Sequence, residues 1–157
     1  MPATPQPPAS PVDIEALADS LVACANALHT RLMRAIRAST RAPDGSLEHG
    51  LTQAAAQSLF ENEVALRQRA NQLYLDAATL AAGGLAGQQQ QLLELTAQAQ
   101  DQLRTINRLK DLIDITGELL AVGAAVASGQ PEHLAAPLEK IRHHLGALRA
   151  AAPPPAS

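Results

Sequence analysis

Residues 109–128, LKDLIDITGELLAVGAAVAS, decide the fold, because apolar side chains cover more of the helix circumference here than elsewhere in the chain. A helix that packs on one side of a bundle needs one apolar stripe. This stretch has two stripes, one formed by Leu109, Leu112, Ile115, Leu119, Val122 and Val126, the other by Ile113, Leu120 and Ala124. Two apolar faces require neighbours on two sides, so we expect this segment at the centre of a helical bundle.

The composition of the whole chain is that of an all-α protein. Of 157 residues, 46% are hydrophobic but only 1% are aromatic, and most apolar residues are Leu or Ala, which favour helices. No segment alternates β-branched or aromatic residues with polar ones, as strands do. We therefore predict a soluble all-α fold: an elongated antiparallel bundle of four helices, up-down-up-down, with two long helices and a short fourth helix.

Proline and glycine divide the chain into tails and helices. The Pro-rich segments 1–10 and 152–157 are expected to be disordered tails on either side of a single domain, 11–151. The first helix starts with Pro11 behind a Ser10 cap, and the glycines at 83, 84, 87 and 129 end the second and third helices. The predicted helices cover 11–41, 46–82, 88–128 and 135–151.

The unequal helix lengths predict a thick end and a thin end of the bundle. The fourth helix can cover only the second half of the third, which places 109–128 in the thick end. Near the glycine hairpin, two helices alone cannot bury all the leucines, and exposed apolar patches often mark contact surfaces. The candidate partner-binding residues are Leu73, Tyr74, Leu75, Leu80, Leu85, Leu92, Leu93 and Leu95.

Charge and targeting signals limit the partners and the compartment. A net charge of −3 disfavours a general nucleic-acid-binding surface, which needs many Lys and Arg contacts with phosphates. No signal peptide is recognised at the N-terminus, and no window is apolar enough for a membrane span. With a single cysteine, these features predict a cytoplasmic protein, and secretion without a cleavable signal stays open. The Ala-rich, Lys-poor composition suggests a bacterial source with a GC-rich genome.

No catalytic or cofactor motif is recognised, so we expect no enzymatic activity, no cofactor and no metal. The five histidines lack the spacing of common metal motifs, and Cys24 falls on the apolar stripe of the first helix, where burial is expected. Asp111, Asp114 and Glu118 share one helix face, which can suit a metal or an acid–base pair. We favour a solvated stripe, because no ExxH motif is available on a facing helix.

Basic charge is concentrated in one row near the end of the first helix. Arginines in such a row can bind an acidic partner or lipid headgroups. Their placement is also favourable at the negative end of the helix dipole, and we favour this second interpretation. The row consists of Arg31, Arg34, Arg37 and Arg41.

These features favour a non-enzymatic helical bundle that mediates protein–protein interaction as an adaptor, a chaperone or a structural component, with a secretion-associated role open. The hairpin end of the second and third helices is the expected contact surface, and the partner is another protein or a second copy of the chain. Two alternatives stay open. One is a membrane-active bundle or secreted effector component whose segment 109–128 enters lipid, and the other is an amphipathic coat protein of apolar granules.

Overall fold

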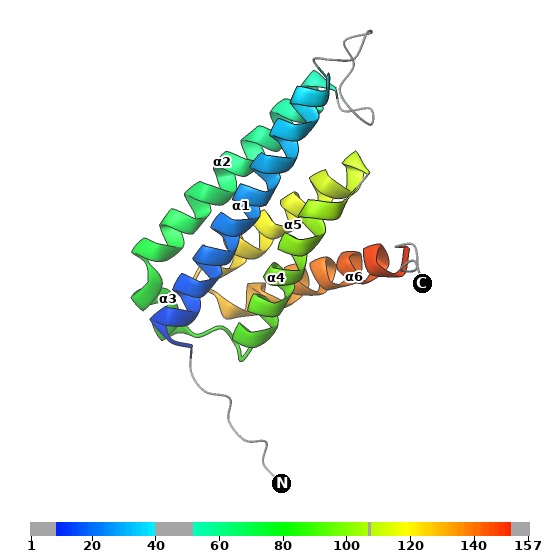
Figure 1. Ribbon diagram of the computed structural model, residues 1–157. Helices are drawn as coiled ribbons and strands as arrows, with labels where there is room; N and C mark the ends of the chain where they lie inside the picture. The colour runs from blue at the N-terminus through cyan, green and yellow to red at the C-terminus, as the bar shows by residue number, and fades with distance from the viewer. Residues whose placement is uncertain (1–8, 40–51, 107, 152–157) are drawn as a thin grey trace.

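The computed structural model describes residues 9–39, 52–106 and 108–151, and the regular structure of these residues is helical throughout (Figure 1). This confirms the all-α prediction. The elements are α1 (Pro11–Ser39), α2 (Gln53–Leu75), α3 (Ala77–Gly83), α4 (Gln89–Thr105), α5 (Leu109–Ala127), the 3₁₀ turn η2 (Pro131–His133) and α6 (Ala135–Ala151). Residues 1–8 and 152–157 of the predicted tails, the predicted break at 41–46 and Arg41 lie outside the described residues, whereas Ala9 of the first tail packs against the core.

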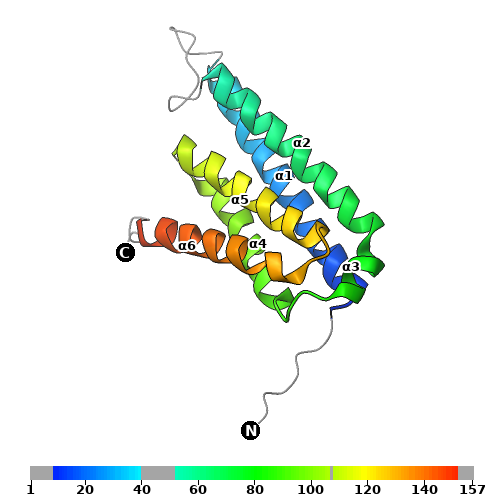
Figure 2. The same ribbon diagram turned by 180° about the vertical axis from the view of Figure 1, so that it is seen from behind.

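The long helices form two antiparallel pairs that pack against each other. In Figures 1 and 2, α1 and α2 run in opposite directions, as do α4 and α5, and α1 runs parallel to α4. The α1 helix packs mainly against α2 and α4, and α5 packs mainly against α2 and α6. The last helix, α6, lies against both α4 and α5. The expectation that residues 109–128 have neighbours on two sides is therefore confirmed.

The prediction of a continuous third helix over 88–128 is wrong. Helix α4 ends at Thr105 and α5 begins at Leu109, with extended backbone at Ile106 (φ −59°, ψ 126°) and at Arg108 (φ −90°, ψ 125°). Because the chain reverses here, α4 can pack against α1 while α5 packs against α2 and α6. The predicted arrangement of four helices is thus replaced, among the described residues, by six α-helices.

The second predicted helix, 46–82, is also divided. Thr52 caps the described start of α2, its hydroxyl accepting a hydrogen bond from the Ala55 amide at 3.1 Å. At Asp76 the backbone (φ −103°, ψ 11°) leaves helical geometry, which separates α2 from the short α3. The turn predicted from the glycines follows α3, and Gly84 and Gly87 both have positive φ there. The last helix begins and ends as predicted, at Ala135 and Ala151.

The core is a continuous set of leucine, isoleucine, valine and alanine side chains supplied by every α-helix. Leu17, Leu66, Leu103 and Leu119 are among its fully buried members. Cys24 is also fully buried, as predicted, and its thiol lies 3.7 Å from the Thr96 carbonyl on α4. Among the helices that the structure describes, none combines the length and the apolarity that crossing a membrane requires.

Candidate functional site

The predicted partner-binding patch at the hairpin end is not an exposed leucine surface. Leu93 is partly buried against the core, and five other leucines of the set are buried. A bare two-helix tip was expected there, but α1 packs against both α3 and α4 and covers it. The buried residues are Leu73, Leu80, Leu85, Leu92 and Leu95.

Two residues of the predicted set do remain exposed. Leu75 is 86% exposed and Tyr74 is 39% exposed, at the end of α2. The Tyr74 hydroxyl donates a hydrogen bond to Asp19 on α1, and this bond, together with burial and the charges of Asp19 and Glu15, raises the pKa of Tyr74 to about 12. Tyr74 therefore ties α2 to α1, and Leu75 alone does not form a patch.

A groove between the parallel helices α1 and α4 is the first candidate site. Its volume is about 450 Å³, and it is open to solvent along one side. We call it the arginine groove. Its lining residues are Ala23, Asn26, Ala27, Thr30, Arg31, Arg34, Gln100 and Arg104.

The groove exists because the α1 face beside α4 carries small side chains. Ala23, Ala27 and Thr30 follow one another at helical spacing along this face, so α1 leaves space over α4 instead of filling it. The underlying seam stays closed through buried residues such as Leu28 and Leu103. The groove is thus a surface depression above an intact core.

Positive charge gathers at one end of the arginine groove. Arg31 donates a hydrogen bond to the Ile106 carbonyl at 3.3 Å, which holds its guanidinium beside the end of α4. Arg34 and Arg104 are exposed, and neither has an acidic partner in the described parts of the chain. No carboxylate is present among the lining residues. This end of the groove suits an anionic group.

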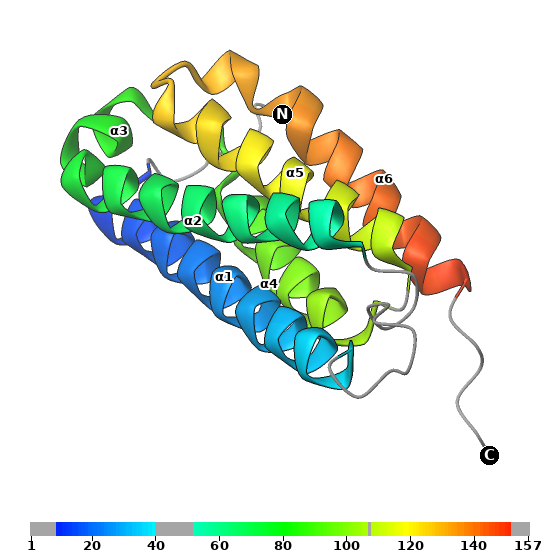
Figure 3. The ribbon, with the colours of Figure 1, turned by 90° about the horizontal axis from the view of Figure 1, so that it is seen from above.

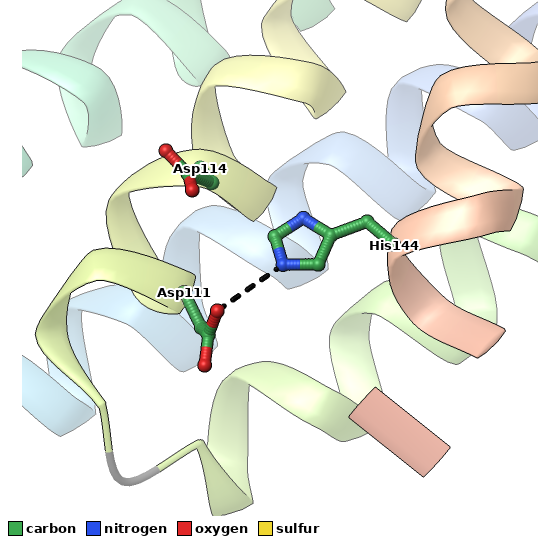
Figure 4. A group of neighbouring side chains, drawn as sticks. All are labelled: Asp111, Asp114 and His144. Carbon is green, nitrogen blue, oxygen red and sulfur yellow. Dashed lines mark hydrogen bonds and ion pairs between the residues drawn. The ribbon is translucent and has the colours of Figure 1, made fainter. Parts of the chain in front are cut away.

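The second candidate site joins α5 to α6 and is built on His144. Figure 4 shows the His144 imidazole reaching from α6 toward Asp111 and Asp114, which lie one turn apart on α5. His144 Nε2 is 3.3 Å from an Asp111 oxygen, and Nδ1 is 3.1 and 3.0 Å from the two oxygens of Glu118. We call Asp111, Asp114, Glu118 and His144 the His144 cluster.

The cluster is largely shielded from solvent. The side chains of Asp111, Glu118 and His144 are only 19%, 10% and 17% exposed. Burial by itself lowers the pKa of His144, but hydrogen bonds and charge interactions with Glu118 and Asp111 outweigh it, so the pKa of His144 is raised. The two carboxylates therefore stabilise the charged imidazolium relative to the neutral ring.

The sequence interpretation of these carboxylates as a solvated stripe is wrong. Glu118 is buried, and Asp111 and Asp114 are partly buried beneath α6. Sequence reasoning missed the histidine because the pair His143–His144 lies on another helix, outside any short motif. The available signal was that adjacent histidines point in different directions, so one of them can face α5 while the other is exposed.

A third polar group links α1 to α2 and has its hydrogen bonds satisfied. His29 Nδ1 lies 2.9 Å from one oxygen of the buried Glu63, and Arg67 donates two hydrogen bonds to the other oxygen, at 3.2 and 3.1 Å. The Phe60 ring lies edge-on to His29, with centroids 6.5 Å apart. Both Glu63 oxygens are occupied, so this group acts as a structural tie.

Comparison of the chain with protein-family models, with curated proteins and with solved structures found no significant match.

Proposed function

We propose that the protein is a non-enzymatic interaction module whose arginine groove binds an acidic segment of another protein. The observation that supports this proposal is the concentration of Arg31, Arg34 and Arg104 at one end of an open groove without a carboxylate in its lining. Guanidinium groups form strong, bidentate hydrogen bonds with carboxylates, which gives such a site both affinity and direction.

The length of the groove favours a peptide segment over a small anion. On α1 the lining extends from Ala23 to Arg34, a distance of about 16 Å at the rise of an α-helix. A small anion would occupy only the arginine end, whereas a segment of about five extended residues spans this distance. Asn26 and Gln100 can then bond the backbone of that segment beyond its acidic residues.

The same surface is a less suitable site for membranes or nucleic acids. A groove presents its charges in a concave depression between two helices, which a peptide can enter more readily than a flat bilayer surface. The net charge of −3 opposes extended contact with a phosphate backbone. Entry of α5 into lipid would also require it to separate from α2 and α6.

The test is binding of a fluorescently labelled, glutamate-rich dodecapeptide to the full chain, followed by anisotropy at low and at physiological salt. The double variant Arg34→Glu, Arg104→Glu is expected to weaken binding by at least about tenfold, because it reverses two exposed charges in the groove. The matched control is Arg142→Glu with Lys140→Glu, which makes the same charge change on α6. Circular dichroism checks that both variants keep their helices.

An equal loss of peptide affinity in the two double variants would mean that binding depends on net charge alone. This result would overturn the assignment of binding to the groove. If the wild-type protein does not bind the peptide but binds vesicles containing anionic lipid, the partner of the groove is a membrane and not an acidic peptide. Light scattering of the peptide-free protein tests whether a second copy of the chain is the partner.

A further inference from the structure

We propose that the His144 cluster binds a divalent transition-metal ion through Asp111, Asp114 and His144. The three side chains each offer one ligand atom, and these atoms all lie within 4.8 Å of one another. An imidazole nitrogen with two carboxylate oxygens is a ligand set that Zn²⁺ and its neighbours in the first transition row accept. The site is separate from the arginine groove, so it does not depend on the proposed function.

The spacing of the ligand atoms fits an ion between them. Zn²⁺ binds histidine nitrogen and carboxylate oxygen at about 2.0–2.2 Å, so two ligands of a tetrahedral site lie roughly 3.3–3.5 Å apart. His144 Nε2 and the Asp111 oxygen are already 3.3 Å apart. Asp114 lies one turn further along α5 (Figure 4), and its ligand oxygen lies within 4.8 Å of the other two ligand atoms.

Glu118 orients His144 for metal binding. Its two oxygens lie 3.1 and 3.0 Å from His144 Nδ1, so the Nδ1–H is donated to the carboxylate. In the neutral imidazole the lone pair is then on Nε2, which faces Asp111. Metal-binding histidines commonly donate their other N–H to a carboxylate, because this fixes the ring and strengthens the nitrogen as a ligand. Glu118 is therefore a positioning residue.

The charge balance also favours a divalent cation. Asp111, Asp114 and Glu118 bring three carboxylates to one imidazole, and a proton on His144 compensates only one of them. Lys140 is the cation among the residues that line the cavity beside Asp114 and Glu118. A divalent ion that replaces the proton on Nε2 neutralises the site more completely.

An open cavity of about 410 Å³ gives access to the cluster. Asp114, Gly117 and Glu118 form part of its wall, and a Cβ at Gly117 would meet no atom from another element within 4 Å. Of the three proposed ligands, Asp114 borders this cavity, so water in the cavity can approach the site from the Asp114 side. The remaining lining residues are Ile113, Ala121, Pro137 and Lys140.

The test is titration of the full-length protein with Zn²⁺ by calorimetry after treatment with a chelator, followed by Co²⁺ titration to record the visible ligand-field bands. We expect one ion per chain. Asp114→Asn is the decisive variant, because the Asp114 side chain has no hydrogen bond or ion pair within the described residues, so a purely structural cluster does not need its charge. This variant and His144→Ala should each lower the affinity by at least about tenfold.

Two further variants distinguish the proposed metal ligands from the residues around them. Glu118→Gln should weaken binding by about 10–100-fold, as loss of an orienting carboxylate does elsewhere. His143→Ala, on the exposed neighbour of His144, should leave both affinity and the Co²⁺ spectrum unchanged.

Failure to bind Zn²⁺ would overturn the proposal and leave a structural ion-pair cluster. Unchanged affinity in Asp114→Asn and His144→Ala would equally overturn it, since the ion would then bind elsewhere. Loss of affinity in His143→Ala alone would show adventitious binding at an exposed histidine.

Discussion

His144 connects α6 to α5 through charged hydrogen bonds, and its protonation should therefore affect stability. The neighbouring charges are those of Asp111, Asp114 and Glu118 on α5 and of Lys140 on α6. Because the pKa of His144 is raised on folding, the stabilisation is fully present below the pKa of an unfolded histidine, about 6.5. It is lost as pH rises through the raised pKa of the folded state.

We predict that His144→Gln destabilises the protein more at pH 5.5 than at pH 9. The expected loss at pH 5.5 is about 1–3 kcal/mol, the range for hydrogen bonds to charged groups. Urea unfolding in the presence of EDTA measures it without interference from metal ions. His143→Gln is the control and should have little effect at either pH. A loss for His144→Gln that is the same at both pH values would contradict the prediction.

Two glycines of α5 should respond in opposite ways to alanine. A Cβ at Gly123 would lie 2.8 Å from Arg69 Cγ and 3.3 Å from Leu21 Cδ1, whereas a Cβ at Gly117 has no such neighbour within 4 Å. Gly117→Ala should stabilise by about 0.5–1 kcal/mol through helix propensity. Gly123→Ala should destabilise by about 1–2 kcal/mol, because overpacking outweighs that gain.

Thermal and urea unfolding of these two variants provide the measurement. Since both glycines lie in the same helix, both substitutions should gain about the same free energy from helix propensity. The difference between their unfolding free energies therefore measures the effect of packing. Equal stabilisation by both substitutions would mean that the Arg69 side chain moves aside at little cost.

Among the helices, α6 packs on one side of the bundle, against α4, α5 and the η2 turn, and it should open first. Leu145 and Ile141 are buried in its interface. We predict that Leu145→Ala weakens α6 by about 2–5 kcal/mol, the usual cost of such a core truncation. Hydrogen exchange should then show lower protection in α6 while α1 and α2 keep theirs.

The control for this prediction is Glu139→Ala on the exposed side of α6, which removes a side chain without opening the core. Protection that falls equally in α1, α2 and α6 would mean that the bundle unfolds as one unit. In that case α6 would not be a separate cooperative segment.

The elements themselves could be predicted where local sequence decides them. The apolar stripes give the helices, and the glycines at 83, 84 and 87 give the turn before α4. The reversal after Thr105 could not be found in this way, since residues 105–108 contain neither Gly nor Pro. It depends on contacts made by distant parts of the chain, including the hydrogen bond from Arg31 to the Ile106 carbonyl.

The candidate sites were even less accessible to sequence reasoning, because each combines residues from two helices. The helix face shared by Asp111, Asp114 and Glu118 could be recognised, but the approach of His144 depends on how α6 lies on α5. Likewise, the arginine row was visible on α1, whereas Arg104 joins it only because α4 runs parallel to α1. Periodicity predicts the face of one helix and not the helix that packs against it.

At the scale of the whole molecule, the two candidate sites lie on different pairs of helices. The arginine groove lies between α1 and α4, and the His144 cluster lies between α5 and α6. In the view of Figure 3, α1 and α6 are on opposite sides of the bundle. The arginines of the groove and the carboxylates of the His144 cluster are thus separated, although the chain as a whole carries a net charge of only −3.

This separation predicts that the two ligands bind independently. Saturating Zn²⁺ should change the affinity for the acidic peptide by less than about twofold, since the sites share no residue and linkage must act equally in both directions. Anisotropy titrations with Zn²⁺ and with EDTA make the comparison. A large change in affinity would indicate that the two helical pairs move relative to each other.

Chemical labelling of the buried Cys24 thiol can be used to follow the opening of the interface between α1 and α4. Burial raises its pKa to about 12, and the chain has no other cysteine, so a thiol reagent has a single, closed target in the native protein. The rate of labelling then measures how often α1 separates from α4. A peptide that bridges Arg34 and Arg104 across these helices would slow this reaction, so the rate would report partner binding without an attached dye.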